Sequence, residues 1–228
     1  MIERRTLGST GIEVGRIGIS SSFGAQADVF RAALDRGCNY FNWGTFIKGR
    51  NSAFREFVRQ LTREGRRQEL VIGLLSYSHL ASLGDRFLKS ALKQLDNDYL
   101  DGLILGYYPK RPPRRVLDWA ARVKQQGLVR AIGLTTHNRS VVVPLSKEGI
   151  IDFFHVRYNA VHRGAEQDIF AHLGEQGPGI VSFTATSWGQ LLKPKKMPAA
   201  TPTPSARRRP SPTTARRTRS RARGPTSV

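Results

Sequence analysis

Seven short apolar runs, each separated from the next by a segment with helical periodicity, constrain the fold of this chain more than any other feature. The runs are continuous rather than alternating, which is typical of strands buried on both faces of a parallel sheet. Between them apolar residues recur at helical spacing, as in Leu88, Ala91 and Leu95, which predicts helices packed on the sheet. The runs are residues 16–20, 39–42, 70–75, 100–105, 129–134, 152–157 and 179–183.

An open doubly wound sheet and a closed barrel both fit this alternation of strands and helices. The first strand-to-helix turn separates them, because a dinucleotide-binding open sheet would carry G-x-G-x-x-G there. Residues 18–26 read GISSSFGAQ instead. We therefore predict the α/β class with a (β/α)8 barrel of the TIM type, whose chemistry lies at the C-terminal ends of the strands.

The composition indicates the cellular location of the chain and which kinds of site its sequence lacks. The single cysteine, Cys38, cannot form an internal disulfide, and the N-terminal segment has no apolar signal region, so we predict a cytoplasmic protein. No stretch approaches the roughly 20 apolar residues that span a bilayer. The sequence also lacks any Cys/His spacing typical of a zinc site.

The charge is concentrated at the C-terminus. The net charge is +20, and residues 193–228 contain 11 Lys and Arg but no Asp or Glu. Of residues 199–228, 28 of 30 are Ala, Thr, Pro, Ser or Arg, a composition that cannot bury a core. We predict an incomplete barrel domain over 1–193, without its eighth βα unit, and a disordered basic tail over 194–228.

Three interpretations of the tail remain open. Its arginines could bind nucleic acid or another polyanion by neutralising phosphates, although no base-reading motif accompanies them. It could be an appendage without function. It could also be an out-of-frame translation of GC-rich coding DNA, because the pattern stops where an eighth strand should begin.

Several segments, in the same order along the chain, resemble the aldo-keto reductases. The resemblance implies a (β/α)8 barrel that binds NADPH and reduces aldehydes or ketones. The segments are RTLGSTGIEVGRIGIS (5–20), ALDRGCNYFN (33–42), LDNDYLDGLIL (95–105), GLVRAIGLTTHN (127–138), VRYNAVHRGAE (156–166) and GIVSFTATSWGQLL (179–192).

The resemblance also implies four catalytic positions, and all four are substituted. The family's aspartate falls on Asn42, its proton-donating tyrosine on Ile47, its lysine on Leu75 and its histidine on Gly106. The changes are consistent with one another, because an aspartate beside Leu75 would be a buried carboxylate without a cation. We expect no catalytic tetrad and a weakly active or inactive reductase.

An alternative keeps an active oxidoreductase with rearranged acid-base groups, drawn from Tyr77 or Tyr107 with His137. The competing interpretation gives these residues amphipathic packing roles in loops. A third expectation concerns Arg157, which together with Arg163 and Glu166 is predicted to form a scaffolding salt-bridge network.

The cofactor side is better preserved than the catalytic side. The resemblance implies that Thr135, Thr136 and His155 hold the nicotinamide carboxamide. It also implies that Phe183 stacks on the nicotinamide ring and that Thr184 lies near the phosphates. Inward-facing barrel residues with ordinary packing roles are the alternative for each. NADP(H) is the expected cofactor, with binding weak or lost, and a small carbonyl compound is the expected substrate.

Overall fold

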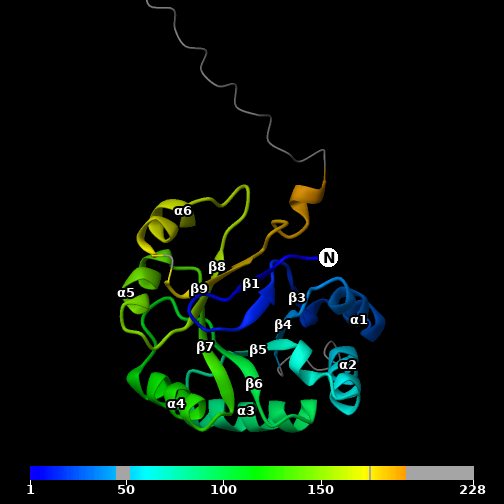
Figure 1. Ribbon diagram of the computed structural model, residues 1–228. Helices are drawn as coiled ribbons and strands as arrows, with labels where there is room; N and C mark the ends of the chain where they lie inside the picture. The colour runs from blue at the N-terminus through cyan, green and yellow to red at the C-terminus, as the bar shows by residue number, and fades with distance from the viewer. Residues whose placement is uncertain (45–51, 175, 194–228) are drawn as a thin grey trace, which may run out of the picture.

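The computed structural model describes residues 1–44, 52–174 and 176–193 (Figure 1). Two sequence predictions concern residues outside these ranges. Ile47, the predicted tyrosine position, and residues 194–228, the predicted basic tail, lie outside the described residues. The disordered tail and its three interpretations therefore stay predictions.

Seven parallel strands form one sheet in which spatial order equals sequence order. Each strand pairs with the next one along the chain, as in a singly wound barrel and unlike the doubly wound arrangement. This confirms the predicted (β/α)8 type, and the described residues contain seven of its strands. They are β3 (Gly18–Ser20), β4 (Tyr40–Trp43), β5 (Val71–Ser76), β6 (Leu100–Leu105), β7 (Val129–Thr136), β8 (Phe153–Arg157) and β9 (Gly179–Phe183).

Helices lie between the strands and cover the outer face of the curved sheet, as α2, α3 and α4 show most clearly (Figure 1). No helix within the described residues is long and apolar enough to cross a membrane. The helices are α1 (Ala27–Asp35), α2 (Ser52–Arg63), α3 (Ala81–Leu95), α4 (Arg114–Gln125), α5 (Val142–Ser146) and α6 (Ala165–Asp168). Short 3-10 turns are η1 (Ser21–Phe23), η2 (Arg67–Glu69), η3 (Arg139–Val141), η4 (Phe170–His172) and η5 (Gln190–Leu192).

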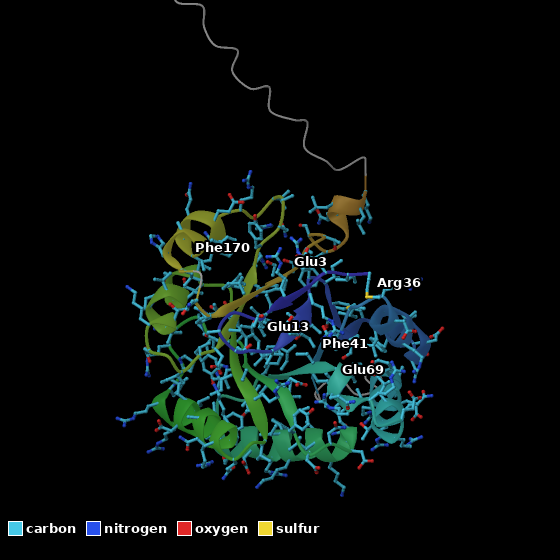
Figure 2. All side chains as sticks on the ribbon, viewed as in Figure 1. Glu3, Glu13, Arg36, Phe41, Glu69 and Phe170 are labelled. Atoms are coloured by element: carbon cyan, nitrogen blue, oxygen red, sulfur yellow. The ribbon has the colours of Figure 1, made fainter. Side chains whose placement is uncertain are left out.

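The core between sheet and helices is rich in aromatic rings. Phe41 on β4, labelled in Figure 2, is fully buried and packs edge-on against Phe30 of α1, with ring centroids 6.0 Å apart. Phe54 of α2 contacts both rings, at 5.2 Å from Phe30 and 5.7 Å from Phe41. Edge-to-face contacts of this kind add to the burial of apolar area, so they fix the first two helices against β4.

An N-terminal hairpin fills the inner face of the sheet at the end where the strands begin. Strands β1 (Arg4–Thr6) and β2 (Glu13–Gly15) are antiparallel, and the turn between them buries Leu7 and Ile12 in one cluster with Val71 and Phe153. The hairpin therefore provides part of the barrel's interior core.

The hairpin is also joined to the last strand of the sheet. Gly8 forms an isolated bridge to Pro178 and has a φ of 55°. A Cβ atom on Gly8 would lie 2.1 Å from the backbone nitrogen of Gly179. Only glycine fits this close approach of two backbones.

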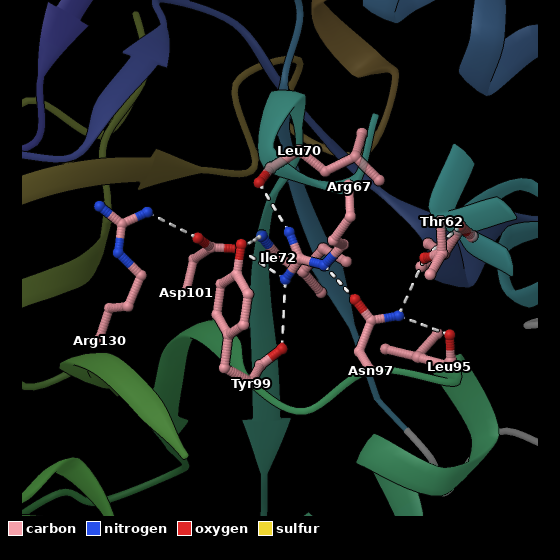
Figure 3. Close-up of polar contacts among 10 residues, drawn as sticks. Thr62, Arg67, Leu70, Ile72, Leu95, Asn97, Tyr99, Asp101 and Arg130 are labelled. Atoms are coloured by element: carbon pink, nitrogen blue, oxygen red, sulfur yellow. Dashed lines mark hydrogen bonds and ion pairs between the residues drawn. The ribbon is translucent and has the colours of Figure 1, made fainter. Parts of the chain in front are cut away.

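A buried carboxylate, Asp101, joins three strands at the same N-terminal end (Figure 3). Its Oδ2 accepts hydrogen bonds from Arg67 Nη2 and from the backbone nitrogen of Ile72, each at 2.9 Å. Its Oδ1 accepts one from Arg130 Nη1 at 2.9 Å. Arg67 also bonds the carbonyl of Leu70 and the side chain of Asn97. The network links β5, β6 and β7, and it serves the stability of the sheet.

The two arginines that flank Asp101 provide a matched stability test. The Arg67 side chain is 9% exposed and the Arg130 side chain is 49% exposed. Removing the buried partner leaves the Asp101 carboxylate with Arg130 as its remaining described cation, and that cation is half-exposed. Arg67→Gln should therefore lower the free energy of unfolding by up to about 3 kcal/mol, the lower end of the range for breaking a buried ion pair. Arg130→Gln removes a surface pair and should cost about 1 kcal/mol or less. Urea denaturation of both variants measures the difference, and equal losses would contradict the assignment.

Candidate functional site

The C-terminal strand ends form a mouth toward which alternate side chains point. The interior packing shows which strand positions face inward, since Phe153 lies in the interior cluster and His155 bonds across the barrel to Tyr40. Because side chains alternate along a strand, the residue two positions after an inward residue also faces inward. The inward residues at the ends of their strands are Ser20, Asn42, Leu75, Gly106, Thr135, Arg157 and Phe183.

Three of the four predicted catalytic positions are described, and none carries an ionisable group. Asn42 ends the inward face of β4, and its Oδ1 is buried without a hydrogen-bond partner in the described part of the chain. Leu75 and Gly106 end the corresponding faces of β5 and β6. None of these three residues has a side chain that can transfer a proton to a substrate carbonyl or carry a charge.

The space that a histidine would need at Gly106 is already filled. A Cβ atom on Gly106 would lie 2.7 Å from Cγ2 of Thr135 and 3.3 Å from a ring carbon of Tyr77. Any larger side chain would displace the threonine. The glycine is therefore a packing requirement of this mouth, and the histidine cannot be restored by a single substitution without movement.

A tyrosine and a histidine meet inside the barrel, below the mouth. Tyr40 Oη lies 2.8 Å from His155 Nε2, and both residues are buried. Burial lowers the pKa of His155 to about 4 and raises the pKa of Tyr40. At neutral pH both groups are uncharged. His155, predicted to hold a carboxamide, has its Nε2 occupied by this pair.

Tyr107 and His137, the pair named for rearranged acid-base chemistry, lie in contact at the rim. Their ring centroids are 5.0 Å apart, and His137 also packs edge-on against Phe183 at 5.2 Å. Partial burial of the ring, and secondarily the positive charge of Arg157, lower the pKa of His137. Tyr77 lies beside Gly106 instead, and burial raises its pKa.

The two predicted threonines face opposite sides of β7. Thr135 is on the inward face, beside Gly106. Thr136 is buried on the outward side, where its hydroxyl accepts a hydrogen bond from the backbone nitrogen of Asn138 at 3.0 Å and donates to its carbonyl at 3.3 Å. Its hydroxyl therefore serves a local turn, and Thr135 carries the hydroxyl that β7 presents to the mouth.

The end of β9 brings the remaining predicted cofactor residues to the mouth. Phe183 is the last residue of the strand, and Thr184 follows in the left-handed region with a φ of 57°. The Thr184 hydroxyl donates to the carbonyl of Phe183 at 2.7 Å. This local bond leaves Phe183 as the side chain from β9 that can contact a ligand ring.

Asn159 holds this turn, a role that its sequence context does not predict. Its Nδ2 donates to the carbonyl of Thr184 at 2.8 Å, while its Oδ1 accepts from the backbone nitrogens of Val161 and His162, each at 3.0 Å. A side-chain amide that bonds the backbone two residues on is typical of asparagine in turns. The link across two strand ends, however, is a tertiary contact without a sequence signal.

The predicted network of Arg157, Arg163 and Glu166 is partly wrong. Arg163 and Glu166 form an ion pair at 2.9 Å, and Tyr158 donates to the same carboxylate at 2.7 Å. Arg157 takes no part in it. Among the described residues no group of three or more His, Cys, Asp or Glu side chains is placed to hold a metal ion.

Fold and site together define a singly wound parallel α/β barrel, with no ionisable group at the three described positions among those predicted to be catalytic. The sequence model of the Aldo/keto reductase family matches residues 12–222. This range covers most of the chain, so the protein belongs to the aldo-keto reductase family. No curated protein sequence matches the chain.

Solved structures agree on the fold. The holo form of aldo-keto reductase AKR11C1 from Bacillus halodurans is similar with a TM-score of 0.70 and 22% identity, over 87% of this chain and 71% of that one. The protein PA4992 from Pseudomonas aeruginosa, described as of aldo-keto reductase type, gives a TM-score of 0.63 and 23% identity, over 78% and 76%. At these identities the likeness supports the barrel architecture.

The buried histidine should make stability depend on pH. His155 has a folded pKa of about 4 against an ordinary value of 6.5, so its full contribution to stability is present above pH 6.5. As the pH falls below 6.5, His155 becomes protonated in the unfolded chain but stays neutral in the folded chain. The free energy of unfolding therefore decreases by up to about 3 kcal/mol by pH 4.

Urea unfolding at several pH values measures this dependence. His155→Gln keeps an acceptor for Tyr40 but cannot titrate, so its loss of stability between neutral and acidic pH should be smaller than that of wild type. His172→Gln, at an exposed histidine, is the matched control and should retain the wild-type slope. A parallel slope in wild type and His155→Gln would contradict the prediction.

Proposed function

We propose that this chain is an aldo-keto reductase barrel that binds a nicotinamide dinucleotide weakly and reduces carbonyl compounds slowly or not at all. The observation that carries the proposal is that Asn42, Leu75 and Gly106, at three of the four proposed catalytic positions, carry no ionisable group. NADP(H) rather than NAD(H), a small carbonyl substrate and a cytoplasmic location are parts of the same proposal.

The residues present fit one end of such a cofactor. Phe183 is half-buried at the mouth and would offer its ring to the nicotinamide, since flat rings stack favourably on aromatic side chains. Thr135 would donate or accept one hydrogen bond at the carboxamide. The bound cofactor would supply a hydride. Thr136 and His155 have polar groups engaged within the protein, so fewer groups hold the ring and binding should be weak.

Proton delivery is what this mouth lacks. General acid catalysis by a positioned side chain contributes about 10²–10⁴-fold to a rate. An electrostatic partner for the developing oxyanion contributes about 10²–10³-fold more. The described mouth places an apolar Leu75 and a side-chain-free Gly106 where these groups would act. Reduction of simple aldehydes should therefore be slower by several orders of magnitude than in a barrel with its tetrad.

Two threonines on opposite faces of β7 allow a sharp test of cofactor binding. Thr135→Val removes the hydroxyl that faces the mouth and should weaken NADPH binding about 3- to 10-fold, the value of one hydrogen bond. Thr136→Val removes a hydroxyl bound to Asn138 and should lower stability while leaving the affinity unchanged. Titration of NADPH fluorescence measures both. Equal affinities in the two variants would count against Thr135 as a cofactor ligand.

Turnover tests the catalytic half of the proposal. NADPH oxidation is followed with a panel of aldehydes and ketones, and ordinary family-like turnover would overturn the inactive assignment. The ring contact between Tyr107 and His137 favours one alternative, an oxidoreductase that uses these groups. If activity is found, Tyr107→Phe should abolish it under this alternative, and unchanged activity would remove Tyr107 as the proton donor.

A further inference from the structure

One guanidinium at the barrel mouth has a donor without an acceptor. Arg157 is the last residue of β8, on the strand face that carries Phe153 and His155 inside the barrel. Its Nε is buried and has no hydrogen-bond partner in the described part of the chain. The side chain as a whole is only partly exposed. A buried N–H that finds no acceptor within the protein is uncommon in native structures.

Ion pairing within the protein does not explain Arg157. Other shielded arginines have carboxylate partners, such as Arg67 with Asp101 at 2.9 Å and Arg31 with Glu64 at 2.9 Å. No ion pair of Arg157 occurs among the residues that the structure describes. The Nε of Arg59 also has no hydrogen-bond partner in the described part of the chain. Arg59 lies on the outer helix α2, however, whereas Arg157 lies at the barrel mouth.

Three aromatic rings stand around the Arg157 end of the mouth. Arg157 pairs in strand register with Phe183, which packs against His137 at 5.2 Å, and His137 contacts Tyr107 at 5.0 Å. The positive charge of Arg157 reaches His137, because it contributes to the lowered pKa of that ring. The mouth thus places a guanidinium near three aromatic rings.

We propose that Arg157 forms an oxyanion subsite for a carboxylate or phosphate carried on a planar ring. A guanidinium presents parallel N–H donors that match two oxygens of such a group. The oxyanion would accept a hydrogen bond from Arg157 Nε, while Phe183, His137 and Tyr107 would contact the ring. The inference goes beyond the proposed function, because an aryl carboxylate would bind here without the dinucleotide.

The test uses the full chain and compares two sources of the oxyanion. Benzoate supplies a carboxylate on a ring, benzamide is its neutral match, and NADP⁺ supplies phosphates. Binding is followed by the ring signals of His137, one of five histidines, in carbon-edited NMR spectra. Benzoate should shift these signals in wild type, and benzamide should not.

Variants at Arg157 assign the effect. Arg157→Met keeps most of the side-chain volume and should weaken binding of the oxyanion by at least about tenfold. Arg157→Lys keeps the positive charge but lacks the parallel N–H donors of the guanidinium. Its affinity for the oxyanion should lie between those of wild type and Arg157→Met. Arg114→Met, at an exposed arginine of α4, changes the net charge equally and should leave affinity unchanged.

Every outcome bears on the inference. Loss of benzoate binding in Arg157→Met supports a carboxylate ligand, and loss of NADP⁺ binding alone supports a cofactor phosphate. If NADP⁺ fails to bind wild type while benzoate binds, cofactor binding is refuted and the subsite stands. If Arg157→Met does not fold, the wild-type comparison of benzoate with benzamide and the Arg157→Lys series decide. Unchanged affinity for both anions in the variants, or no response of His137 to either, overturns the proposal.

Discussion

The alternation of side chains along parallel strands determines both what fills this barrel and what its mouth presents. Each strand sends every second residue inward. The inner face is therefore apolar near the strand starts, where Val71 and Phe153 pack under the hairpin, and carries a Tyr40–His155 pair halfway up. Six of the inward residues at the strand ends are partly exposed: Ser20, Asn42, Leu75, Thr135, Arg157 and Phe183. These terminal positions are where the inner face of the sheet can meet a ligand.

The terminal positions are consistent with one another under the proposed correspondence with the family's catalytic residues. Leu75, at the proposed lysine position, has no charge that could pair with an aspartate, and Asn42 is neutral. The Gly106 position is then packed by Thr135 and Tyr77. At the end of β8, Arg157 adds a positive charge to the described mouth.

Much of the fold could be predicted from the sequence, because continuous apolar runs and helical stripes are local signals. All seven predicted runs are strands, and the barrel follows from their order. The site was less predictable. Thr135 and Thr136 are neighbours in sequence, and which of them faces inward depends on register, where one residue reverses the face. The bond from Tyr40 to His155 joins residues far apart along the chain, and no local pattern encodes it. Arg157 was grouped with Arg163 and Glu166 by proximity in sequence, but its strand points it into the mouth.

The bridge between Gly8 and Pro178 has a consequence for how the molecule assembles. It joins the first hairpin to the start of the last described strand, with almost every other strand and helix lying between them in the chain. Contacts between such distant segments are slow to form, because the intervening chain must be ordered first. During synthesis the hairpin leaves the ribosome long before its partner exists. The packing of Leu7 and Ile12 is therefore complete only after the last described strand has formed, and until then part of their apolar surface stays exposed.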